Sequence, residues 1–249
     1  MEPSSLISTG AIALLGLGLV FGLKHAMEVD HVVAVSTIVS EHRNLLRATL
    51  VGGLWGIGHT VSLVVVGVVV LVFRVAIPEA VANWLEFGIA LMIIGLGFMA
   101  LWRVFRKRAD VHVHEHTHDG RSHVHIHFHE PATAHRPVFK APSHSHAISQ
   151  VGFKPLLVGA MHGLAGSAAL TLLVLSQIQS VGLGLLYLLL FGLGSTMGML
   201  FMSGMIGLPF ALSARRLTGI NNGLQTAAGV ISIAFGVWYA YGSGVTGLR

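Results

Sequence analysis

Long apolar runs alternate with short polar segments along the whole chain. A helix rises 1.5 Å per residue, so about 20 apolar residues cross the ~30 Å of hydrocarbon in a bilayer. Six runs reach this length, at 7–39, 50–73, 84–105, 152–178, 182–211 and 221–242. The pattern therefore predicts an all-α polytopic membrane protein with six transmembrane helices.

The second half of the first run carries a cluster of polar residues: Lys24, His25, Glu28, Asp30 and His31. An ionised side chain at the centre of a bilayer costs about 3 kcal/mol, so these groups need partners or a function. Two imidazoles and two carboxylates suit a divalent transition metal. The alternative is a polar cluster that only holds helices together through hydrogen bonds.

Helix geometry limits how this cluster can bind one ion. At about 100° per residue, a straight helix turns Asp30 away from the broad face that carries His25, Glu28 and His31. We therefore expect the first helix to break near residues 22–25. Asp30 then either binds the metal or orients a histidine ring.

The chain also repeats itself after about 137 residues. Gly22, His25, Asp30 and His31 lie over Gly159, His162, Ser167 and Ala168, and Gly58-His59-Thr60 lies over Gly194-Ser195-Thr196. Three helices followed by three place the halves in opposite orientations, as in transporters whose site lies at the midplane between inverted repeats. We expect two three-helix repeats, 1–106 and 151–249, with the first and possibly the fourth helix broken.

Two more histidines lie inside apolar runs. A lone histidine in a membrane helix is as often a packing residue as a ligand. His59 and His162 align with the polar cluster through the repeat, which favours a functional role for both. The candidate metal residues are therefore His25, Glu28, Asp30, His31, His59 and His162.

The charges outside the runs predict the orientation. Arginine and lysine gather in the segments after the first, third and fifth runs, and the opposite side has only Arg74 and Arg249. By the positive-inside rule, both termini lie outside and the long central loop is cytoplasmic. The excess of 15 Lys and Arg over 10 Asp and Glu thus reports topology and not nucleic-acid binding. The absence of cysteine excludes thiolate metal sites and thiol redox chemistry.

The loop 107–150 holds eleven of the 16 histidines: His112, His114, His116, His118, His123, His125, His127, His129, His135, His144 and His146. Such a segment cannot build an apolar core, so we expect it to be disordered. Clustered imidazoles bind Ni²⁺, Co²⁺ or Zn²⁺, which favours metal capture, buffering or sensing. A pH-sensitive linker is the alternative.

These motifs resemble a known family. His25-x4-Asp30-His31 resembles the His-x4-Asp-His signature of the nickel/cobalt transporter family, and Gly58-His59-Thr60 is similar to its second-helix histidine motif. The segment from His162 to Ala169, with six spans, is closest to the six-span urease-accessory (UreH-type) branch. The resemblance implies transport of Ni²⁺ or Co²⁺, with His25, Asp30, His31 and His59 as selectivity residues.

The expected function is therefore transport of a divalent metal ion, most of all nickel, through a midplane His/Asp site. We expect no permanently bound cofactor and no enzymatic activity, because neither a Walker motif nor His-Glu-x-x-His is present. The alternatives are an exporter or sensor of Zn²⁺ or another divalent metal that uses the loop, and a membrane metalloenzyme. The implied setting is the bacterial inner membrane, with a cytoplasmic metallochaperone or urease or hydrogenase maturation factors as further partners.

Overall fold

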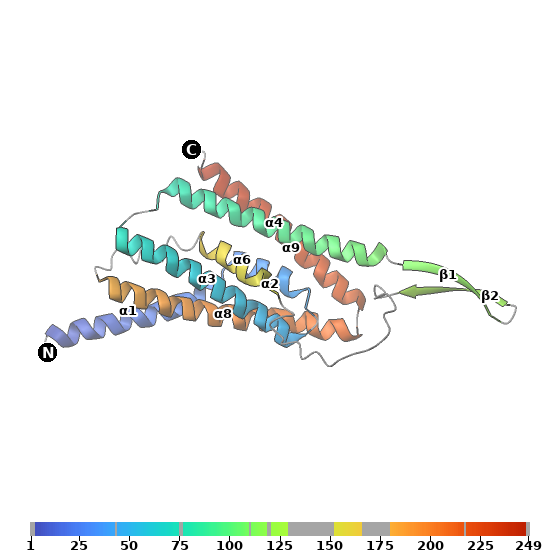
Figure 1. The fold of residues 1–249 in the computed structure, drawn as a ribbon, viewed down its shortest axis with the longest axis horizontal. Coiled ribbons are helices and arrows are strands. Elements are labelled where there is room, and N and C mark those ends of the chain that lie inside the picture. Colours follow the sequence, from blue (N-terminus) through green and yellow to red (C-terminus); the bar gives the residue numbers. More distant parts are fainter. Residues whose placement is uncertain are drawn as a thin grey trace.

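The computed structural model describes residues 3–42, 44–74, 77–109, 111–118, 121–128, 152–165, 180–216 and 218–247. Its helices are α1 (Pro3–His25), α2 (Val29–Val39), α3 (Leu45–Phe73), α4 (Glu79–Ala109), α6 (Lys154–Gly163), α8 (Val181–Arg216) and α9 (Thr218–Gly247). Two strands, β1 (Val111–His118) and β2 (Arg121–Phe128), form a hairpin between α4 and α6 (Figure 1).

The helices follow the apolar runs closely. Four of the described helices, α3, α4, α8 and α9, are long and apolar enough to span a membrane, and the pair α1 and α2, bent by 54°, adds a fifth if it is counted as one broken span. The first run is broken as predicted, but the break lies at residues 26–28, just after the predicted position near 22–25. Of the predicted fourth span, α6 covers the first part, and residues 166–178 lie outside the described residues. The structure confirms a polytopic helical membrane protein.

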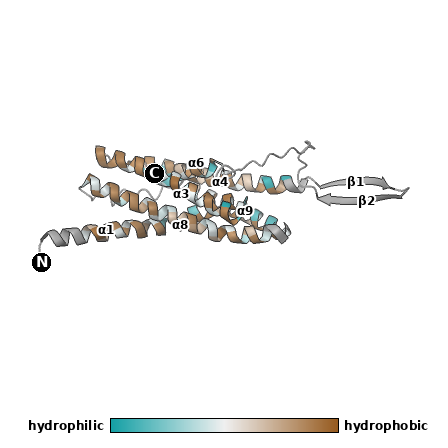
Figure 2. Ribbon diagram, turned by 60° about the horizontal axis from the view of Figure 1, so that its bottom comes forward, coloured by the Kyte–Doolittle hydropathy of each residue, from teal (hydrophilic) through white to brown (hydrophobic). Residues whose placement is uncertain are grey.

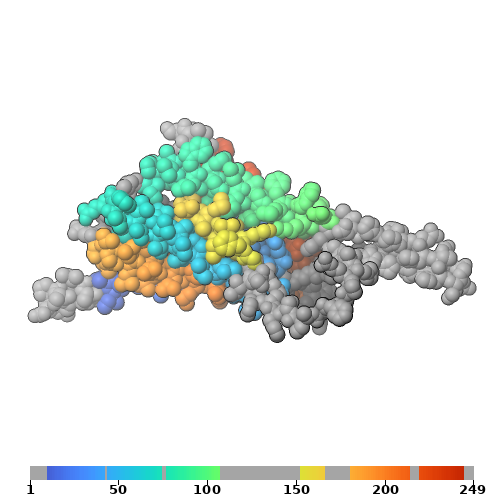
Figure 3. Space-filling model, in the orientation of Figure 1, coloured from blue at the N-terminus to red at the C-terminus, as the bar shows by residue number. Residues whose placement is uncertain are grey.

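The long helices pack around the short helix α2. α8 packs along both α1 and α3, α6 packs on α3, and α4 pairs with α9. α2 lies between these groups and contacts α8, α9, α4 and α3 (Figure 1). On the face shown in Figure 3, α6 is seen between α3 and α4. The short helix α2 therefore joins the α4–α9 pair to the remaining helices.

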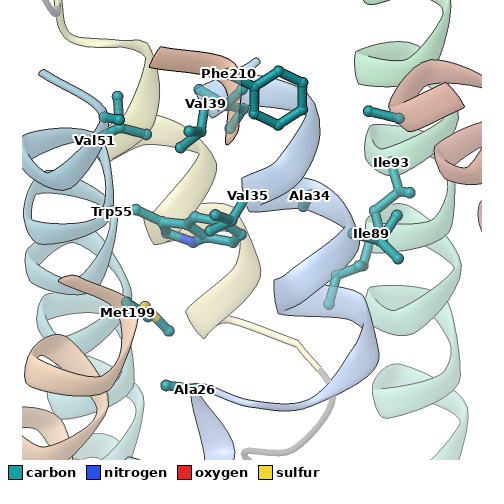
Figure 4. Packing of buried hydrophobic residues seen from close by; sticks show 14 of the residues in the cluster. Ala26, Ala34, Val35, Val39, Val51, Trp55, Ile89, Ile93, Met199 and Phe210 are labelled. Atoms are coloured by element: carbon teal, nitrogen blue, oxygen red, sulfur yellow. The ribbon is translucent and has the colours of Figure 1, made fainter. Parts of the chain in front are cut away.

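The interior around α2 is tightly packed. Val35 and Val39 of α2 are buried together with Trp55 of α3, Ile93 of α4 and Met199 of α8. Figure 4 shows Trp55 extending from α3 toward α2, and Ile93 reaching α2 from α4. At one end of α2, Glu41 forms an ion pair with Arg103 of α4. Residues from three neighbouring helices thus fix the position of α2.

The exterior of the bundle is apolar, as expected for a surface in contact with lipid. Brown, hydrophobic residues run along most of each helix in Figure 2. Three tryptophans are among the exposed side chains: Trp84 and Trp102 on α4, and Trp238 on α9. Tryptophan is enriched where a membrane protein meets the headgroup region. Exposed apolar surface of this extent would be unfavourable in water.

Part of the histidine-rich segment differs from the expected disordered loop. β1 and β2 pair antiparallel, and the register places His112 opposite His127, His114 opposite His125, and His116 opposite His123. The reason lies in the alternation of histidine with valine and isoleucine, which has the two-residue period of a strand. Residues 129–150 lie outside the described residues, and the domain boundaries stay a prediction.

The packing of α6 on α3 depends on a close approach at Gly159. A Cβ atom at this position would overlap the backbone carbonyl oxygen of Trp55. We expect Gly159→Ala to lower the free energy of unfolding by about 1–3 kcal/mol, as overpacking of an interior does. Thermal unfolding in detergent measures this effect. Gly88→Ala is the matched control, because a Cβ there meets nothing within 4 Å; an equal loss of stability in both variants would contradict the prediction.

Candidate metal centre

The centre forms where the first transmembrane segment breaks. α1 ends in a tightened turn, in which the amide of Met27 donates to the carbonyl of Lys24 and that of Glu28 to the carbonyl of His25. Glu28 then adopts an extended backbone and becomes the N-cap residue of α2. His25 is thus the last residue of α1, and His31 lies in the first turn of α2. The break removes the constraint of a straight helix and lets both histidines face one point.

His25 connects a carboxylate with a second histidine. Its Nδ1 lies 3.1 Å from a carboxylate oxygen of Glu28, and its Nε2 lies 3.2 Å from Nε2 of His59, in the middle of α3. An ionised carboxylate only accepts hydrogen bonds, so in a neutral ring Nδ1 of His25 carries the hydrogen and Nε2 presents a lone pair. Two lone pairs cannot face each other at 3.2 Å. A hydrogen or a metal ion must therefore lie between His25 and His59.

Asp30 joins two other histidines. Nδ1 of His31 donates to one carboxylate oxygen of Asp30 at 3.1 Å, and Nε2 of His162 donates to the other at 2.8 Å. His162 is in the last turn of α6, so this carboxylate links α2 to the second half of the chain. The position of Asp30 in the first turn of α2 also suits a negative charge, because the helix dipole is positive there.

The four histidines are almost completely buried, with exposed fractions of 3% for His25, 0% for His31, and 1% for His59 and His162. Nε2 of His31 has no hydrogen-bond partner among the described residues. The ring of His31 lies 4.5 Å from that of His25, 5.4 Å from that of His59 and 4.2 Å from that of His162, between centroids. The imidazoles thus form one continuous cluster inside the protein.

Two overlapping sets of ligand atoms result. One comprises His25, His31 and His59, and the other comprises Asp30, His31 and His162; in each set one atom per residue lies within 4.8 Å of the others. His31 belongs to both. All six residues that the sequence singled out, including Glu28, therefore lie in one place, and their role as metal ligands stays a prediction.

Sequence reasoning missed two aromatic neighbours of the cluster. Trp55 of α3 stacks on His31 at 5.7 Å between ring centroids, and Phe191 of α8 lies 5.4 Å from His25. Within an apolar run an aromatic residue does not stand out. The available signal was their position: Trp55 precedes His59 by four residues, and Phe191 precedes Ser195, the repeat equivalent of His59, by the same distance.

Comparison with known proteins identifies the protein family of this chain. Residues 11–218 match the NicO family, described as high-affinity nickel-transport protein. The chain belongs to this family of membrane transporters, which confirms the resemblance to nickel/cobalt transporters. Among individual relatives it is similar to the "Urease accessory protein UreH" of Bacillus sp. (strain TB-90), with 39% identity over 235 residues that cover 94% of this chain and 93% of the relative. No solved structure matches the chain.

The buried charge of Asp30 gives a test of the geometry without metal. His162→Leu removes one of its two imidazole donors, and leaving a buried polar group unpaired costs about 1–3 kcal/mol. We therefore expect a lower melting temperature in detergent with a chelator present. His162→Gln is the control, because its amide keeps an N–H donor of similar reach, and it should lose less. Equal losses in the two variants would mean that the contact with Asp30 contributes nothing.

Proposed function

We propose that the protein carries Ni²⁺ across the membrane through a site formed by the Nε2 atoms of His25, His31 and His59. The observation that carries this proposal is the 3.2 Å approach of the buried Nε2 atoms of His25 and His59, in a group where one ring nitrogen each of His25, His31 and His59 lie within 4.8 Å of one another. Three imidazole nitrogens suit Ni²⁺, Co²⁺, Cu²⁺ and Zn²⁺ alike. Membership of a nickel-transport family favours nickel among these, with cobalt as the nearest alternative.

The carboxylates act through the histidines in this proposal. Glu28 accepts from Nδ1 of His25 and Asp30 from Nδ1 of His31, so each favours the tautomer whose Nε2 presents a lone pair to a metal ion. Their two negative charges also balance the two positive charges of the ion. This balance matters because an uncompensated charge is costly inside a membrane protein. Asp30 thus serves as an orienting residue, and His162 holds it in place.

Two helix ends favour a cation at the same point. His25 ends α1, and His162 lies in the last turn of α6. The C-terminal end of a helix carries a partial negative charge, and broken transporter helices use such ends to hold cations. The cargo would therefore be held by imidazole nitrogens in a field that two helix termini and two carboxylates make negative.

The contacts between helices support the inverted repeat. Gly22 of α1 packs against the carbonyl of Phe191 on α8, and Gly159 of α6 packs against the carbonyl of Trp55 on α3. Gly22 and Gly159 are 137 positions apart, and Trp55 and Phe191 are 136 apart. The same contact thus occurs twice with the halves exchanged. Equivalent residues also meet each other, because the hydroxyls of Thr60 and Thr196 are 3.0 Å apart.

This arrangement supports a site near the midplane. His59 is the fifteenth of the 29 residues of α3. The first turn of α1 and the last turn of α9 lie at one end of the bundle, and the hairpin and the α8–α9 turn lie at the other (Figure 1). Together with the positive-inside rule, this supports six spans, outside termini and a cytoplasmic histidine-rich segment in the bacterial inner membrane. A cytoplasmic metallochaperone or urease maturation factor would then handle the ion on that side.

Removal of individual ligands tests the site. We expect His25→Ala and His59→Ala to lower the initial rate of radioactive nickel uptake into proteoliposomes more than Asp30→Asn does. Asp30→Asn keeps the direct ligands and disturbs their orientation, which typically costs about 10–100-fold in affinity. His42→Ala, in the link between α2 and α3, is the control and should transport normally. Unchanged flux in both His25→Ala and His59→Ala would disprove the site.

A metal sensor is the second candidate function, because the register of β1 and β2 places histidines at opposite positions of the two strands. Deletion of residues 111–147 separates the two functions. A transporter should keep its maximal nickel flux after this deletion, with at most a changed apparent affinity, since its site lies in the helices. Proteoliposome flux measured over a range of Ni²⁺ concentrations gives both values. Complete loss of flux in a variant that still unfolds at the normal temperature would favour the loop as the functional part.

A further inference from the structure

Two buried aromatic side chains flank the histidine cluster. The ring of Trp55 is nearly parallel to that of His31, with an interplanar angle of 9°, and it meets His162 edge-on at 5.6 Å between centroids. The ring of Phe191 lies 5.4 Å from that of His25. Trp55 is 0% exposed and Phe191 is 4% exposed. An ion that leaves the cluster past either ring would have to displace it.

The two rings occupy equivalent positions in the two halves. Trp55 and Phe191 are related by the repeat, and their backbone carbonyls make the same contact, with Gly159 and Gly22 respectively. The equivalence therefore rests on packing as well as on sequence spacing. The two halves contribute unequally to the histidines around the rings. The first half provides His25, His31 and His59, and the second half provides His162.

The rings lie on opposite sides of the site. Because Thr60 and Thr196 are hydrogen-bonded to each other, they lie at the same height along α3 and α8. Trp55 precedes Thr60 by five residues and Phe191 precedes Thr196 by five, which is about 7 Å along each helix. α3 and α8 run in opposite directions (Figure 1). Trp55 is thus displaced toward the end with the α2–α3 turn, and Phe191 toward the end with the α3–α4 turn.

We propose that Trp55 and Phe191 are the two gates of the transport path, each closing the metal site toward one face of the membrane. This inference rests on the proposed transport function. Burial of all four histidines to 3% exposure or less makes the structure an occluded state with both gates closed. Movement of one ring opens the site to one face, while the other ring keeps the opposite face closed. Alternating access then needs only one gate to open at a time.

Accessibility of a buried reporter tests the gates directly. The chain contains no cysteine, so Ser195→Cys introduces a single thiol, at a position whose backbone contacts Gly22, three residues before His25. Ser195 is 0% exposed, and its hydroxyl has no hydrogen-bond partner among the residues described. A charged, membrane-impermeant methanethiosulfonate reagent is applied from each face, with right-side-out and inside-out vesicles. No metal is added, so labelling does not depend on transport.

We expect each gate variant to open one face. In the Ser195→Cys background, Trp55→Ala should raise the labelling rate at least about tenfold from the face at the α2–α3 turn, and Phe191→Ala should do so from the opposite face. Trp55→Phe and Phe191→Leu keep most of the bulk and should fall between wild type and alanine. If an alanine variant fails to fold, these conservative variants still show from which face the thiol becomes accessible.

Leu188→Ala is the matched control, since Leu188 is on the same helix as Phe191 and is 0% exposed. It should leave labelling unchanged. Faster labelling from the same face in both gate variants, or an equal effect of Leu188→Ala, would overturn the proposal. Failure of the metal site is a separate result: nickel flux that survives His25→Ala, together with opposite-face labelling, would remove the ligand assignment and keep the gates.

Discussion

The pairing of one largely buried carboxylate with two imidazoles is the interaction on which the rest of the structure depends. Asp30 lies inside an apolar bundle and is bonded by His31 on its own helix and by His162 on α6. Leaving a largely buried polar group without one of its partners costs about 1–3 kcal/mol. α2 and α6 must therefore stay together, and this contact joins the first half of the chain to the second. The break between α1 and α2 allows it, because it turns the start of α2 toward α6.

The sequence predicted the parts of this site that contrast with their surroundings. Histidines and carboxylates in apolar runs identified all six polar residues of the cluster, and helix geometry predicted the break. The sequence could not show whether Asp30 binds the metal or orients a histidine ring. That distinction depends on the angle at the break and on the histidine rings from α3 and α6. Trp55 and Phe191 escaped notice because burial is what any aromatic residue in such a run would be expected to show.

The cluster is asymmetric inside a nearly symmetric frame. The repeat-equivalent residues Thr60 and Thr196 contact each other, and the glycine contacts occur once in each half. In contrast, Ser195 occupies the position that is equivalent to His59 of the first half. Because the packing is nearly symmetric, each half can form the contacts of the other half when the bundle moves. In the proposed transport, an asymmetric ligand set would let a single ion bind mainly to one half. The division of roles explains why the first half accumulates ligands and the second half retains the packing residues.

A site built across a break is also suited to release its cargo. His25 ends α1, His31 begins α2, and only residues 26–28 connect the two helices. In the proposed site, a small change in the 54° bend would alter the spacing of these imidazoles, because they belong to different helices. Ligands on one continuous helix would keep their spacing through any rigid movement and hold the ion in every state. Tight binding and release are thus compatible here, since the angle that assembles the ligands can also separate them.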